Sequence, residues 1–284
     1  MISRSLMCGL ALSCGLLAVS ANAATPEKRA GKPFADADHV VYFLAGGVGG
    51  KSLLPGGGVV VNLGPVIAQP KVVFIFWGPS FNNPASPDYS YARELQADRN
   101  QFGSTPEWKT IQPYGITWPT NLGSGTPDWF DTSTPPTNVT DSTVRAEVNR
   151  YFSGGHGAYN SSTIYEVLIP KTSYSSSGTS TSCGGPSLAY CAYHGSYSGS
   201  SGTVIYSIQP YPSCNGCKVS GWSDALNQEH FFCAETRSAA VNPVNGGEDP
   251  DAKCAWSPTP FIGTGGYGYQ YEWSNAANEC IKTR

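Results

Sequence analysis

The chain has 284 residues, a formal net charge of −3 at pH 7 and only 13% charged residues, against an average of about 25% for soluble domains. Such a charge balance provides no basic field for nucleic acid or for an anionic bilayer, so we expect no nucleic acid partner. The length suffices for one large domain or two small ones. Frequent glycine, proline and tyrosine (33, 22 and 16 residues) are typical of a loop-rich extracellular domain.

Residues 1–23 have the anatomy of a secretory signal peptide, with a positive charge at Arg4, an apolar run and small residues before a cleavage site after Ala23. We therefore predict a secreted protein, extracellular or periplasmic. A competing lipoprotein interpretation places the cleavage before Cys14, but it shortens the apolar run. No later stretch approaches the roughly 20 apolar residues of a membrane span, so none is predicted.

The rest of the chain divides into a weakly ordered N-terminal arm, residues 24–57, and a single domain, residues 58–284. An unbroken apolar run at 71–78 predicts a central strand covered on both faces. In chain order the patterns predict strands at 58–63 and 71–78, helices at 89–100 and 143–152, strands at 163–169 and 203–208, and a long helix at 223–243. This order predicts the α/β class, with α+β as the alternative, and a mixed sheet with packed helices.

The long helix at 223–243 carries the densest set of potentially catalytic side chains in the sequence. Ser223 and Asp224 suit its first turn, where side-chain oxygens accept hydrogen bonds from unpaired N–H groups. Glu229 and Glu235 are the candidate catalytic residues, since a carboxyl group can act as an acid or a base. An enzymatic function would therefore depend on this helix.

Three tryptophans lie in a long Pro- and Thr-rich region at 103–140, namely Trp108, Trp118 and Trp129. Flat aromatic faces stack on sugars, so all three are candidate ligand-binding residues for carbohydrate. The favoured interpretation is that they fill a core beneath the loops, because aromatic burial dominates protein cores.

Nine cysteines are present, of which the leader removes Cys8 and Cys14 and leaves seven. An oxidising compartment pairs most of them, and an odd number leaves one thiol over. We predict Cys233 as the free thiol, because a cysteine within an amphipathic helix is usually a small buried apolar residue. The predicted disulfides are Cys183–Cys191, Cys214–Cys217 and Cys254–Cys280, although the tight 214–217 loop leaves other pairings open.

Several short motifs occur in a defined order. They are Gly64-Pro65-Val66, Phe76-Trp77-Gly78, Glu107-Trp108-Lys109, Tyr190-Cys191-Ala192-Tyr193-His194-Gly195, Cys214-Asn215-Gly216-Cys217 and Ala240-Val241-Asn242-Pro243. The set resembles the secreted EXORDIUM (phosphate-induced protein 1) family of plants and its bacterial relatives, over roughly residues 58–247. The resemblance implies an extracellular, cell-wall-associated protein whose molecular activity is not settled. We expect a cell-wall polysaccharide or an extracellular protein as its partner.

Some bacterial relatives carry His-Glu-x-x-Glu on this helix, which is similar to the metal-binding helix of zinc peptidases. The corresponding positions are Ala234-Glu235-Thr236-Arg237-Ser238, so the histidine and the second carboxylate are absent. A substitute zinc site would combine His194 and His230 with Cys233 or Glu235. We therefore expect a secreted binding or wall-associated protein without a cofactor, and the alternative is a zinc-dependent, peptidase-like hydrolase.

Overall fold

The computed structural model describes residues 39–43 and 65–284, apart from 118, 120, 126 and 245–248. In this part of the chain the main sheet has six strands in the order β1-β8-β9-β5-β2-β3. They are β1 (His39–Phe43), β2 (Lys71–Trp77), β3 (Trp129–Asp131), β5 (Thr163–Ile169), β8 (Tyr190–Gly199) and β9 (Gly202–Pro210). β9, β5, β2 and β3 are parallel neighbours, whereas β8 is antiparallel to β9 and β1 is antiparallel to β8.

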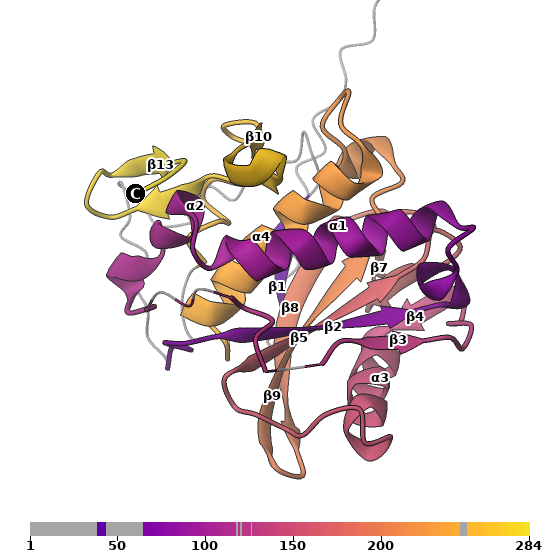
Figure 1. Ribbon diagram of the computed structural model, residues 1–284. Coiled ribbons are helices and arrows are strands. Elements are labelled where there is room, and N and C mark those ends of the chain that lie inside the picture. The colour runs from indigo at the N-terminus through magenta and orange to yellow at the C-terminus, as the bar shows by residue number, and fades with distance from the viewer. Residues whose placement is uncertain (1–38, 44–64, 118, 120, 126, 245–248) are drawn as a thin grey trace, which may run out of the picture.

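Helices pack on both sides of this sheet. They are α1 (Pro87–Phe102), α2 (Pro106–Lys109), α3 (Asp141–Ser153) and α4 (Asp224–Val241). Figure 1 shows α1 and α4 lying together over one face and α3 beneath the other. The predicted α/β class, a mixed sheet with packed helices, is confirmed.

Shorter elements complete the described chain. β4 (Asn138–Thr140), β6 (Tyr174–Ser177) and β7 (Ser180–Thr181) form a small sheet, and β10 (Phe261–Ile262), β11 (Gly268–Tyr269), β12 (Glu272–Ser274) and β13 (Glu279–Ile281) form two antiparallel pairs. Short 3-10 turns are η1 (Pro79–Asn82), η2 (Gln112–Tyr114), η3 (Asn215–Cys217) and η4 (Thr264–Gly266). In Figure 1 the yellow C-terminal segments β10 and β13 lie beside the α1–α4 layer.

Strand β2 shows why the sheet is buried on both faces. Its side chains alternate, so Phe74 belongs to the core with α1 and α4, where its ring centroid lies 5.0 Å from that of Phe232. The neighbouring Val73 belongs to the core with α3. An apolar residue at every position therefore fills two cores at once, which confirms the prediction from the 71–78 run.

The polar first turn correctly predicted the start of α4. Ser223 accepts a hydrogen bond from the Leu226 N–H at 3.1 Å, and α4 ends one residue before Asn242. For α3 the cap is Thr140, whose Oγ1 accepts from the Thr143 N–H at 3.3 Å. The helix therefore begins at Asp141, two residues before the predicted start at 143.

The N-terminal region contains a strand that its composition did not indicate. β1 lies within the expected arm and pairs with β8, with His39 opposite Gly195 and Val40 opposite His194. This short segment forms a strand because β8, which is distant in the sequence, completes its hydrogen bonds. The predicted signal peptide and the predicted strand at 58–63 lie outside the described residues.

Among the described cysteines, the disulfides are Cys183–Cys214, Cys191–Cys217 and Cys254–Cys280. The prediction is confirmed for Cys254–Cys280 and for the free, buried thiol of Cys233. The pairings Cys183–Cys191 and Cys214–Cys217 are wrong. Turn η3 places Cys214 and Cys217 beside β8. Cys214 therefore pairs with Cys183 and Cys217 with Cys191, each at a Cα–Cα distance of 5.5 Å.

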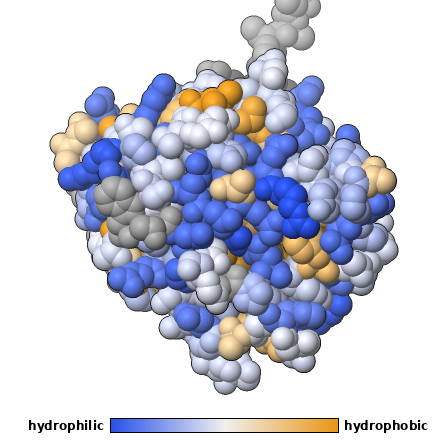
Figure 2. Space-filling view, viewed as in Figure 1, coloured by the Kyte–Doolittle hydropathy of each residue, from blue (hydrophilic) through white to orange (hydrophobic). Residues whose placement is uncertain are grey.

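The surface of the described chain is mainly polar. Figure 2 shows hydrophilic side chains over most of this face, with apolar ones in small separate patches. The large apolar residues exposed in the described part are Val244 and Ile262. No helix there combines the length and the hydropathy that crossing a membrane requires.

Candidate functional site

Helix α4 brings one predicted pair of residues into contact. Nδ1 of His194, on β8, lies 2.9 Å from Oε2 of Glu235, and its Nε2 lies 3.4 Å from the Asn242 carbonyl oxygen. Apart from Asp224 and Leu226 the helix is buried on all sides. A helix without a solvent face that carries several ionisable groups is unusual, because burying a charge is costly.

Three further acids surround this pair, and we call Glu166, His194, Glu235, Asp249 and Asp251 the α4 centre. Glu166 accepts hydrogen bonds from Thr236 Oγ1 and Gln209 Nε2 at 3.0 and 2.9 Å. Asp251 accepts from the Ser238 hydroxyl, and Asp249 accepts from Asn242 Nδ2 at 3.0 Å. The centre thus joins β5, β8, α4 and the segment after α4 through a hydrogen-bonded network.

Burial controls the protonation of these acids. It raises the pKa of Glu235 well above its ordinary value, and the charges of Asp251 and Glu166 raise it further. Burial also raises the pKa of Glu166, and that of Asp249 to about 7. The protonated carboxyl is therefore favoured at Glu235, which suits a hydrogen-bond donor better than a general base.

The α4 centre is closed to solvent. Its members are 0 to 4% exposed. A general base must come within hydrogen-bond distance of the proton that it removes, and side chains this deeply buried are not accessible to a substrate from solvent in this conformation. Hydrogen bonds of this centre link α4 to the strands of the sheet.

Glu229 belongs to a different side of α4. Its Oε2 accepts a hydrogen bond from the Gly268 N–H at 2.8 Å, and burial raises its pKa to about 7. Six residues along an ideal helix place Glu229 and Glu235 about 120° apart. The two candidate catalytic residues therefore do not form one site.

His230 lies in an aromatic environment. Its ring centroid is 4.0 Å from that of Phe231, 5.1 Å from Trp256 and 5.9 Å from Trp222. Burial lowers the pKa of His230 to about 3, so its ring is neutral. His194 instead contacts Glu235 and the Asn242 carbonyl, so the structure places the two predicted metal ligands in different surroundings.

The described residues contain one group of three side chains whose potential ligand atoms lie within 4.8 Å of one another, Cys183, Cys214 and Cys217. All three sulfurs form disulfides, and a thiolate is needed to bind zinc. The substitute zinc set, His194 and His230 with Cys233 or Glu235, is not among such groups. Cys233 instead donates to Asp98 Oδ2 at 3.3 Å.

The three predicted sugar-binding tryptophans differ in their surroundings. Trp108 is fully buried, packs edge-on against Phe102 and donates its Nε1–H to the Thr117 carbonyl at 3.3 Å. Trp108 therefore cannot stack on a sugar at the surface, and the prediction that it binds carbohydrate is wrong. It fills the core, as the favoured interpretation expected. Trp118 lies outside the described residues. Trp129 is half-buried, and the ring of His156 stacks on it at 4.3 Å.

A buried pair of carboxyl groups, Asp131 and Glu147, was not predicted from the sequence. Asp131, at the end of β3, and Glu147, on α3, are buried side by side, and Arg150 Nη1 lies 3.1 Å from Asp131 Oδ2 and 2.7 Å from Glu147 Oε2. Burial and the hydrogen bond to Asp131 raise the pKa of Glu147 to about 8. Burial also disfavours ionised Asp131, but hydrogen bonds from Ser133 and Glu147 and the charge of Arg150 together lower the pKa of Asp131. No local pattern marks this pair, because its members come from different elements.

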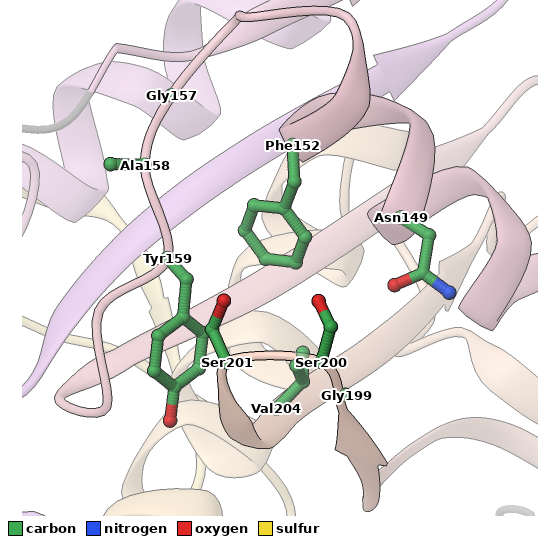
Figure 3. A pocket seen from close by; sticks show the side chains of 9 residues that line it. All are labelled: Asn149, Phe152, Gly157, Ala158, Tyr159, Gly199, Ser200, Ser201 and Val204. Carbon is green, nitrogen blue, oxygen red and sulfur yellow. The ribbon is translucent and has the colours of Figure 1, made fainter.

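An open pocket lies at the turn between β8 and β9, beside the end of α3. Figure 3 shows the hydroxyl groups of Ser200 and Ser201 directed toward the ring of Phe152, with Tyr159 on one side and Asn149 on the other. Its volume is about 160 Å³, and Gly157, Ala158, Gly199 and Val204 complete the lining. This pocket, unlike the α4 centre, is accessible from solvent.

Comparisons with known proteins found no matching family model, no matching curated protein and no matching solved structure. The resemblance to the EXORDIUM family therefore stays a prediction.

Proposed function

We propose that this protein is exported and acts at the cell envelope as a binding protein for wall polysaccharide, without catalysing a reaction. The observation that carries the proposal is the closure of the α4 centre, where Glu235 and His194 are 2% and 0% exposed. The three disulfides support an oxidising compartment outside the cytoplasm. The acids that an enzyme would use serve here to fasten α4 to the sheet.

Co-sedimentation of the purified protein with insoluble wall polysaccharide tests the proposal. The protein should pellet with the polysaccharide and remain soluble with a protein-free inert matrix of equal surface. The variant Glu235→Gln should pellet to the same extent, because the binding surface lies elsewhere. Failure to bind any wall polysaccharide would refute the proposal. Binding to envelope proteins alone would show that the ligand is a protein and not a polysaccharide.

A zinc-dependent, peptidase-like hydrolase is the second candidate. The contact between His194 Nδ1 and Glu235 Oε2 at 2.9 Å favours it, because imidazole and carboxylate are both zinc ligands. On this hypothesis purified protein would contain about one zinc per chain and cleave peptides, and Glu235→Gln would abolish cleavage. We expect neither zinc nor cleavage. A zinc-dependent activity that this substitution removes would overturn the non-enzymatic proposal.

A further inference from the structure

The pocket at the β8–β9 turn has the composition of a sugar subsite, and we infer that it binds one neutral pyranose ring of a polysaccharide. The inference rests on the proposed function, because it assigns that function to a surface.

Two aromatic rings form one corner of the pocket. The ring centroids of Phe152 and Tyr159 lie 6.3 Å apart, and the ring planes meet at 75°. Both side chains are partly exposed. The C–H face of a sugar is apolar, and an aromatic wall shields it from water in the way that it shields other apolar surfaces. The corner therefore offers contact to the ring of a sugar and not only to its hydroxyl groups.

Polar groups at the pocket are available for a ligand. The hydroxyls of Ser200 and Ser201 point into the pocket, and both residues are exposed (Figure 3). Asn149 uses its Oδ1 to accept from Tyr197 at 2.8 Å, which orients its amide NH₂ as a donor. Hydroxyls donate and accept, so these groups match the alternating requirements of sugar hydroxyls.

The walls are held in place by contacts within the protein. Tyr159 donates its hydroxyl hydrogen to the Thr203 carbonyl at 3.0 Å. This close approach requires glycine at 202, since a Cβ there would lie 2.5 Å from the Tyr159 hydroxyl oxygen. A preformed wall spares the ligand part of the ordering cost of binding.

Charge and size narrow the ligand class. No charged side chain lines the pocket, so nothing there pairs with a phosphate, a sulfate or a carboxylate. The volume of about 160 Å³ is below the 300 to 1,000 Å³ typical of sites for larger ligands. One hydroxylated ring, presented by a longer chain, fits these limits.

Two-dimensional amide NMR of the full mature protein tests the assignment. The probes are the methyl glycosides of glucose, galactose, mannose and N-acetylglucosamine. At least one should shift the signals of residues 149–159 and 199–204, with a dissociation constant of about 1 to 10 mM, which corresponds to about 3 to 4 kcal/mol. No shift with any glycoside, or shifts confined to other residues, would overturn the assignment.

Variants separate the pocket from the rest of the surface. The double variant Ser200→Ala with Ser201→Ala should weaken glycoside binding at least fivefold, and Ser201→Tyr, which fills the space, should abolish it. The control, Ser161→Ala with Ser162→Ala, changes two adjacent serines outside the pocket and should bind normally. Unchanged binding by both pocket variants would refute the assignment. If those variants still pellet with wall polysaccharide, the proposed function survives and only its location is wrong.

Discussion

At the scale of single residues, the buried carboxyl groups determine how stability responds to pH. Glu147 shares a hydrogen bond with Asp131, and burial raises its pKa to about 8. In the unfolded chain a glutamate titrates near 4.3. The folded protein therefore holds a proton that the unfolded chain releases between these two values, and stability falls as pH rises through that window.

This linkage gives a direct prediction for Glu147→Gln. Between pH 5 and 8 the free energy of unfolding of the wild type should decrease with pH, and the variant should show a shallower decrease. A residual slope is expected, because burial also raises the pKa of Glu229 and Asp249 to about 7. Urea denaturation at several pH values measures it. The exposed Glu94→Gln serves as control, and an unchanged slope in Glu147→Gln would contradict the interpretation.

Gly202 tests the steric requirement behind the pocket. Its φ of 138° is poorly accessible to other residues, and an added Cβ would lie 2.5 Å from the Tyr159 hydroxyl oxygen. Gly202→Ala should lower stability by about 1 to 3 kcal/mol and displace Tyr159. Gly155→Ala is a matched control, because its φ is also positive, at 70°, but nothing lies within 4 Å of the added carbon. Thermal or urea unfolding should therefore show the larger loss at Gly202, and equal losses would argue against the close contact.

At the scale of elements, local signals predicted the helices and strands whose chemistry is local. The Ser223 cap and the apolar run of β2 are examples, since the required residues are adjacent in the sequence. β1 was missed because its hydrogen bonds come from β8. The disulfides of Cys183 and Cys191 were mispaired for the same reason, because the position of η3 beside β8 is a property of the folded sheet.

The cap of α4 provides a prediction at this scale. Ser223→Ala removes the side-chain acceptor of the Leu226 N–H and should cost about 1 kcal/mol of stability. Ser223→Asp should retain most of it, since a carboxylate also accepts this bond. Chemical denaturation of the three proteins measures the difference. A cost equal for both substitutions would indicate that the side-chain hydrogen bond is not the stabilising feature.

At the scale of the molecule, the sequence predicted the α/β class but not the location of an accessible site. The long helix was the predicted site because it concentrates acids and histidine. In the fold this helix is buried, and His194 and Glu235 contact each other in the interior. The pocket arises where α3, the loop at Gly157 and the β8–β9 turn meet. Serine, glycine and asparagine in loops carry no distinctive motif, so only the fold brings them together.

The central claim is that the protein binds its ligand at the β8–β9 pocket and not at the buried helix α4. Hydrogen–deuterium exchange with and without wall polysaccharide tests this claim most directly. Without ligand, the amides of α4 should exchange only slowly, because the helix is buried on nearly all sides. Added polysaccharide should increase protection at the β8–β9 turn and at Tyr159, and leave α4 unchanged. Protection that instead develops along α4 and around His194 would contradict the proposal and place the site at the α4 centre.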